Sequence, residues 1–83
     1  MSVLMYPLGT EKSITDISRD NVITYVVNLD ASKIDIRKEF EATFKVKVEK
    51  VRVENTPTNE RHAFIKLKKG FDASDVAMKL KLV

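Results

Sequence analysis

The run from Val22 to Leu29 constrains the fold of this chain more than any other segment, because β-branched and aromatic residues dominate it. Such a composition is typical of a β-strand, and the pair Asp20-Asn21 before it favours a turn. Both alternating faces of the run are fairly apolar, so we expect it to be central in a sheet. An 83-residue chain without internal repeats or linkers has room for one core, so residues 1–83 are expected to form a single domain.

Two segments on either side of this strand have the spacing of amphipathic helices. The first runs from Thr10 to about Ser18, and the Thr10 hydroxyl is placed to cap it. The second runs from Lys33 to Lys45, after the capping side chains of Asp30-Ala31-Ser32. Its apolar residues recur at every fourth position, which predicts one buried stripe made of Ile36, Phe40 and Phe44.

The segment after the second helix predicts a β-hairpin. Val46 and Val48 alternate with lysines, and the alternation resumes out of step at Val51, which implies a bulge or a late strand start. Asn55 to Asn59 is rich in turn residues, and Arg61 to Lys68 alternates again as a strand. One face of this last strand is apolar and carries Ala63, Ile65 and Leu67, while the other is mixed and carries His62, Phe64, Lys66 and Lys68.

A short last helix is expected after Gly70, with Asp72 as its cap and with Leu82 and Val83 packed at its end. The element order is then helix, strand, helix, strand, strand, helix. This order predicts an α+β fold, in which a small, mainly antiparallel sheet of three to four strands packs against the helices.

Positive charge is segregated along the chain. The net charge of +3 is modest, yet residues 1–44 carry −2 and residues 45–83 carry +5. Most of the excess lies between Lys45 and Lys69, in and around the expected hairpin. A solvated surface accounts for such a distribution as readily as a polyanionic partner does, so charge alone leaves nucleic-acid binding open.

The residue types that catalysis needs are scarce. His62 is the only histidine and there is no cysteine, so neither a histidine-paired nucleophile nor a cluster of imidazole and thiolate metal ligands can be assembled. The only glycines are Gly9 and Gly70, which excludes a glycine-rich phosphate loop. We therefore expect no enzyme activity and no cofactor. The absence of cysteine, of a secretory signal and of a long apolar run favours a soluble cytoplasmic protein without membrane insertion.

Three ordered blocks of the chain resemble the L-twenty-three family of large-subunit ribosomal proteins. The first is Pro7-Leu8-Gly9-Thr10-Glu11-Lys12, a Pro-x-x-[Ser/Thr]-Glu-Lys pattern near the amino terminus. The second, from Lys33 to Val51, is similar to the central helix of the family and the strand after it. The third combines Ala63 to Leu67 with the tail from Ala73 to Leu82, and is similar to the return strand and closing helix of archaeal-type members. The resemblance thus runs nearly end to end.

The resemblance implies a structural constituent of the large ribosomal subunit that binds large-subunit rRNA near the nascent-polypeptide exit tunnel, beside neighbouring ribosomal proteins. It also implies that Glu11 is the acidic residue that docks nascent-chain factors, with the signal recognition particle nearby, and that Lys12 is the basic residue beside the rRNA. Together with the charge distribution, this gives an expected set of rRNA contacts: Lys12, Arg52, Arg61, Lys66 and Lys68. These residues are expected to read shape and phosphates, without a base code.

The turn from Asn55 to Glu60 is shorter than the long basic loop of bacterial-type members, so contacts that line the tunnel are not expected. Two alternatives stay open. One is a stand-alone RNA-binding domain, although the strand from Arg61 to Leu67 lacks the glycine and the further aromatic residues of an RNA-recognition strand. The other is a small ligand-sensing or dimerising α+β module, which would bind no RNA.

Overall fold

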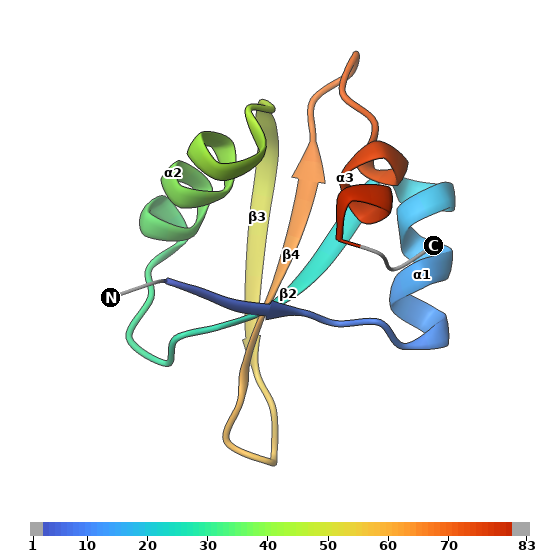
Figure 1. Ribbon diagram of the computed structural model, residues 1–83. Helices are drawn as coiled ribbons and strands as arrows, with labels where there is room; N and C mark the ends of the chain where they lie inside the picture. Colours follow the sequence, from blue (N-terminus) through green and yellow to red (C-terminus); the bar gives the residue numbers. More distant parts are fainter. Residues whose placement is uncertain (1–2, 81–83) are drawn as a thin grey trace.

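The computed structural model describes residues 3–80, and within that range it contains four strands and three helices (Figure 1). In chain order the elements are β1 (Leu4–Pro7), α1 (Glu11–Asp20), β2 (Val22–Val27), α2 (Lys33–Phe44), β3 (Val48–Asn55), β4 (Arg61–Leu67) and α3 (Ala73–Lys79). The predicted α+β class is confirmed. None of the helices between residues 3 and 80 has the length and apolar character that crossing a bilayer requires.

The four strands form one antiparallel sheet in the order β1-β2-β4-β3. β2 has a neighbour on each side, which confirms the central place predicted from its two apolar faces. β3 and β4 form the predicted hairpin, from Val48 opposite Leu67 to Asn55 opposite Arg61. The register shifts between Val48 and Lys50, where the sequence alternation slips. The predicted irregularity is therefore present, at the start of the strand.

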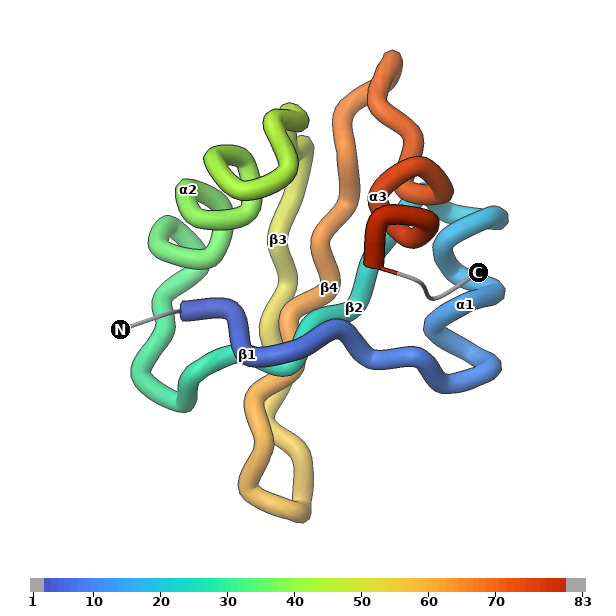
Figure 2. The backbone as a smooth tube through the Cα atoms, viewed as in Figure 1, coloured from blue at the N-terminus to red at the C-terminus, as the bar shows by residue number. Residues whose placement is uncertain are grey.

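β1 is an element that the sequence pattern did not reveal. It pairs with β2 at the edge of the sheet, and only Leu4 among its four residues is buried, so no alternation marks it. Pro7 lacks an N–H group, which an edge strand tolerates because one side of it needs no partner. The Glu39 carboxylate of α2 accepts the backbone N–H groups of Val3 and Leu4 at 2.7 and 2.8 Å. Figure 2 shows β1 passing beside β2 and leading directly into α1.

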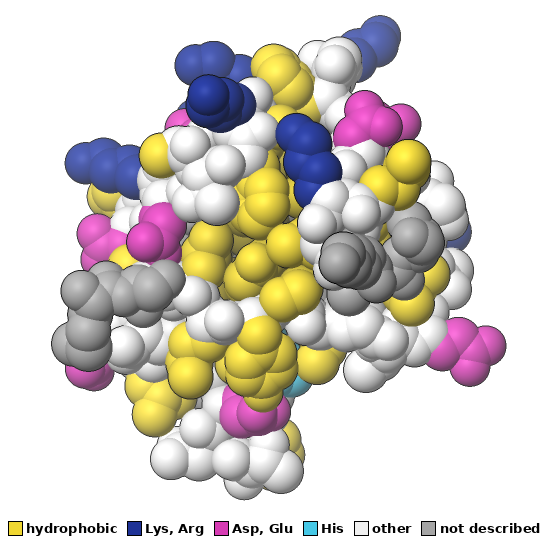
Figure 3. Space-filling model, in the orientation of Figure 1, with side chains coloured by type: hydrophobic (Ala, Val, Ile, Leu, Met, Phe, Trp, Pro, Cys, Tyr) yellow, Lys and Arg dark blue, Asp and Glu magenta, His cyan; other side chains and the backbone are white. Residues whose placement is uncertain are grey.

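One face of the sheet packs against α2 through the predicted stripe. Ile36 and Phe40 are fully buried and Phe44 is half-buried. The Phe40 ring lies 6.2 Å from that of Tyr25 in an edge-on arrangement and 4.7 Å from that of Phe44, measured between centroids. α3 extends the same core with Ala73, Val76 and Ala77. Figure 3 looks onto this side and shows apolar side chains gathered between α2 and α3.

The helix caps predicted from the sequence are confirmed. The side chains of Thr10, Ser32 and Asp72 accept the backbone N–H groups of residues 13, 35 and 74 at 3.2, 3.1 and 3.0 Å. α1 is slightly longer than expected and ends at Asp20. The expected packing of Leu82 and Val83 lies outside the described residues.

Asn21 joins the end of α1 to β4 and α3. Its backbone is left-handed, with φ of 58°, and its N–H group donates to the Asp16 carbonyl. Its side-chain Nδ2 donates to the carbonyl of Phe71 at 2.9 Å and to that of Leu67 at 3.4 Å. Its Oδ1 accepts the N–H group of Ala73 at 2.6 Å. One short side chain therefore fixes the place where two helices and a strand meet.

Replacing Asn21 with alanine is expected to lower the free energy of unfolding by about 2–3 kcal/mol, because part-buried backbone groups lose their partners and alanine disfavours a positive φ. Asn21→Gly separates the two causes, since glycine adopts this backbone without strain but has no amide. It should recover about 1 kcal/mol of the loss. Urea unfolding followed by circular dichroism measures both values. Wild-type stability of Asn21→Ala would show that the amide bonds do not hold this junction.

Candidate nucleic-acid interface

The second face of the sheet carries polar and charged side chains. The apolar core takes Ile23, Tyr25 and Val27 from β2 and Ala63, Ile65 and Leu67 from β4. The strand registers place the intervening residues on the opposite side. We call this side the open face; it is made of Val22, Thr24, Val26, Lys50, Arg52, Glu54, His62, Phe64 and Lys66.

Two lysines of the open face stand directly opposite each other. Lys50 of β3 pairs with Lys66 of β4 in the register, and both are exposed. Like charges at directly opposed positions of a sheet destabilise it, typically by a few tenths to about 1 kcal/mol. The next pair along the hairpin is Arg52 opposite Phe64, with the guanidinium carbon 4.8 Å from the ring centroid. Three positive charges therefore lie close together on this part of the open face.

These basic residues line a hollow between the hairpin and α1, which we call the basic hollow. Its volume is about 210 Å³, and its walls are Asp16, Asp20, Val22, Lys50, Arg52, Phe64 and Lys66. The nearest ion pair of Arg52, to Glu54 at 3.6 Å, is formed by side chains that are 62% and 56% exposed. Such an exposed pair contributes little, so the positive charge remains available to a ligand.

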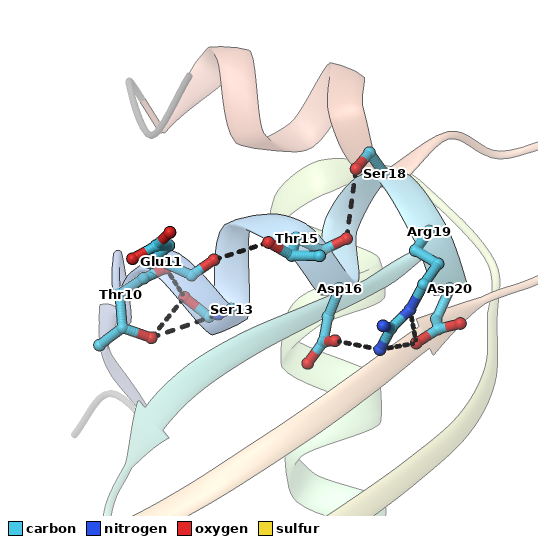
Figure 4. A network of polar contacts seen from close by, with 8 residues as sticks. All are labelled: Thr10, Glu11, Ser13, Thr15, Asp16, Ser18, Arg19 and Asp20. Carbon is cyan, nitrogen blue, oxygen red and sulfur yellow. Dashed lines mark hydrogen bonds and ion pairs between the residues drawn. The ribbon is translucent and has the colours of Figure 1, made fainter.

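On the α1 side the basic hollow is bordered by two carboxylates, Asp16 and Asp20, and both form ion pairs with Arg19. Arg19 Nη2 lies 3.1 Å from a carboxylate oxygen of Asp16 and 3.1 Å from one of Asp20 (Figure 4). The hydrogen bond to Asp20, followed by the charges of both carboxylates, raises the pKa of Arg19. The two carboxylates are therefore partly neutralised and fixed in position beside the lysines.

A second, smaller hollow of about 170 Å³ adjoins the first, because Asp16 and Phe64 line both. It also contains Lys12, Thr24 and His62. Thr24 is buried, and its Oγ1 has no hydrogen-bond partner among the described residues. A buried hydroxyl without a partner costs free energy.

The structure brings together only part of the basic set expected from the sequence. Arg52 and Lys66 share the basic hollow, and Lys12 lies in the adjoining one. Lys68 is exposed just past the end of β4. Arg61 lies on the helix side of the sheet, where its Nε donates to the Ala31 carbonyl at 3.0 Å and its Nη1 donates to Asn55 Oδ1 at 3.1 Å.

Glu11 is separate from both hollows. It is the first residue of α1 and is exposed, and it lines neither hollow. A carboxylate is favourable at this end of a helix, where the backbone N–H groups concentrate positive potential. Figure 4 shows Glu11 at the far end of the helix from Asp20.

Sequence reasoning missed Lys50 as a site residue, although its position two residues before Arg52 is a usable signal. Residues two apart on a strand share a face, so Lys50 and Arg52 had to lie together once β3 was placed. The start of β3 is fixed by Glu41, whose carboxylate accepts the Val48 N–H at 2.8 Å. This bond, more than the nearby charge of Arg37, lowers the pKa of Glu41.

The chemistry of the open face is that of binding. It offers two lysines, one arginine and one aromatic ring, which contact phosphates and bases in nucleic-acid complexes. Within residues 3–80, no group of three or more His, Asp or Glu side chains is placed to hold a metal ion.

Comparison with known proteins shows which family this chain belongs to. The family model described as Ribosomal protein L23 matches residues 2–78. The Large ribosomal subunit protein uL23 of Methanothermobacter thermautotrophicus is 43% identical over 79 residues, which cover 95% of this chain and 92% of that protein. Members of the family are structural, non-enzymatic components of the large subunit of the cytoplasmic ribosome, which confirms the expectation of no enzyme activity. The chain therefore belongs to the Ribosomal protein L23 family.

Proposed function

We propose that residues 1–83 form one domain that binds large-subunit rRNA with its open face. The observation that carries this proposal is the directly opposed pair Lys50 and Lys66 beside Arg52, since neither lysine forms an ion pair among the described residues, although Asp16 and Asp20 line the same hollow. Lysines neutralise phosphates as point charges, and arginine can contact phosphate oxygens in pairs. Structured RNA is recognised in this way through its shape and backbone.

The proposed rRNA contacts extend beyond the basic hollow in two directions, toward α1 and past the end of β4. Lys12 would continue the basic surface on the α1 side, and Lys68 would continue it past β4. Arg61 lies at the turn end of the hairpin on the other side of the sheet, so it would reach rRNA only where the RNA wraps that edge. Each phosphate contact should give a log-log salt slope of roughly 0.7 to 0.9.

Membership of the family supports a place near the nascent-polypeptide exit tunnel, beside neighbouring ribosomal proteins. We propose that Glu11, exposed at the start of α1, is a docking point there for nascent-chain factors or the signal recognition particle. Because Glu11 lies away from the basic hollow, it would remain accessible while rRNA occupies the open face. The short turn of the hairpin, with Thr56 N–H donating to the Glu60 carbonyl at 2.8 Å, would not reach into the tunnel.

Sedimentation of a cell lysate through sucrose gradients at low and high salt tests the proposal. We expect the protein to migrate with the large subunit at low salt and to be released progressively as salt rises, because counterions compete with phosphate contacts. A stand-alone RNA-binding domain would instead stay at the top of the gradient yet bind short single strands. A dimerising module would stay at the top and bind no RNA. Either of these patterns would contradict the proposal.

A further inference from the structure

We propose that Arg52 and Phe64 together form a stacking platform for one unpaired base of the bound RNA, an inference that rests on the proposed rRNA binding. The Arg52 guanidinium lies over the Phe64 ring, which is itself half-buried in the sheet surface. The Arg52 side chain is 62% exposed, so a base can approach the guanidinium from the solvent side. Unpaired bases in RNA complexes stack on aromatic rings and on arginine guanidinium planes.

The surroundings of this platform suit a single nucleotide. The basic hollow, at about 210 Å³, is smaller than the roughly 300 to 1,000 Å³ of sites that enclose whole drug-sized molecules. Lys50 and Lys66 lie in its wall beside Arg52, where they can contact the phosphates that flank a stacked base. A base inside an A-form duplex is already stacked on both sides and cannot enter, so the occupant has to be unpaired.

The opposite wall of the hollow selects among bases. Asp16 and Asp20 line it, and ionised carboxylates accept hydrogen bonds but donate none. Arg19 holds one oxygen of each carboxylate, which leaves lone pairs for a ligand. Adenine, cytosine and guanine carry an exocyclic amino group that can donate to these oxygens, whereas uracil can donate only its ring N3–H, which lies between two carbonyl oxygens. The platform is therefore expected to favour a base with an amino group over uracil.

The test measures affinity for the protein's own large-subunit rRNA, transcribed in vitro, across a series of salt concentrations. Arg52→Lys keeps the charge but loses the planar group, and Phe64→Leu keeps an apolar support but loses the ring. Each is expected to weaken binding about tenfold with an unchanged salt slope, because stacking is lost while the number of phosphate contacts stays the same. The double variant should bind little worse than either single variant, since the two side chains act as one platform. Lys66→Gln, the matched control, should lower the log-log salt slope by roughly 0.7 to 0.9, the value of one phosphate contact.

A second experiment compares the binding of eight-nucleotide RNA oligomers, oligo(A), oligo(C) and oligo(U), at low salt. Free adenosine monophosphate serves as a competitor. We expect oligo(A) and oligo(C) to bind more tightly than oligo(U), and Asp16→Asn to reduce the difference, because an amide can also donate to uracil. The free nucleotide should compete weakly, since it lacks flanking phosphates.

Thermal unfolding establishes that each variant is folded before its affinity is measured. Wild-type affinity of both Arg52→Lys and Phe64→Leu for rRNA would overturn the platform and leave the proposed function standing. A preference for oligo(U) would have the same consequence. Tight binding of the free nucleotide would also overturn the platform, because it would show a site for a small molecule. No binding of rRNA by the unaltered protein would overturn the platform and the proposed function together.

Discussion

Reversing the charge of Lys50 and Lys66 together is expected to prevent incorporation into the large subunit and to weaken binding of isolated rRNA on the order of a hundredfold at 0.1 M salt. Two phosphate contacts are lost, and two negative charges replace them in the hollow that would face the RNA. The log-log salt slope should fall by about 1.4 to 1.8, the value of two contacts. Filter binding over a salt series measures both quantities, and sucrose gradients measure incorporation.

The matched control carries the same change in net charge on the other side of the molecule. Lys38 is exposed on α2 and Lys79 on α3, and neither is among the residues that line the hollows around Lys50 and Lys66, so Lys38→Glu/Lys79→Glu should bind nearly as the wild type does. Equal losses in the two double variants would mean that net charge, and not the open face, governs the affinity. That result would contradict the proposed interface.

The single variant Lys50→Glu separates function from stability. It converts a like-charged pair across the hairpin into an attractive one, so stability should stay the same or rise by a few tenths of a kcal/mol. Affinity for rRNA should nevertheless fall. A gain in stability coupled to a loss in binding is the expected signature of residues retained for a partner.

The elements that the sequence predicted well are those whose local signals and tertiary environment agree. The stripe of Ile36, Phe40 and Phe44 marked α2, and the slipped alternation after Val48 marked the irregular start of β3. β1 could not be found in this way, because its strand conformation comes from pairing with β2 and from the Glu39 carboxylate, both remote in sequence. A four-residue edge strand with one buried residue carries no period of its own.

The candidate site was predictable in its charge and not in its geometry. The excess of Lys and Arg in the hairpin was visible, but which side of the sheet each residue takes depends on the register. Arg61 shows the difference, because it is as basic as Arg52 but lies on the other face of the sheet. It is two and four residues before Ala63 and Ile65 on the same strand, so it shares their helix side, where its Nε donates to the Ala31 carbonyl. The contribution of α1 to the hollow, through Asp16 and Asp20, depends on packing between distant segments.

Truncation of Phe40 to alanine is expected to lower the free energy of unfolding by about 3 to 5 kcal/mol, which is a large part of the total for a small domain. The ring is fully buried between α2 and the sheet and packs against Tyr25 and Phe44, so its removal leaves a cavity that the backbone cannot close. The melting temperature should fall by about 15 °C or more. Phe44→Ala, at a half-buried position of the same stripe, should cost less than half as much.

A milder variant at the same position tests whether stability can change without a change in RNA binding. Phe40→Leu keeps most of the buried volume and should cost about 1 to 2 kcal/mol. Because Phe40 lies on the helix side of the sheet, rRNA affinity below the melting temperature should be unchanged. Lys50→Glu should give the opposite pattern, weaker binding with undiminished stability. If Phe40→Leu instead weakened binding while Lys50→Glu did not, the RNA would have to contact the helix side, and the assignment of the open face would be wrong.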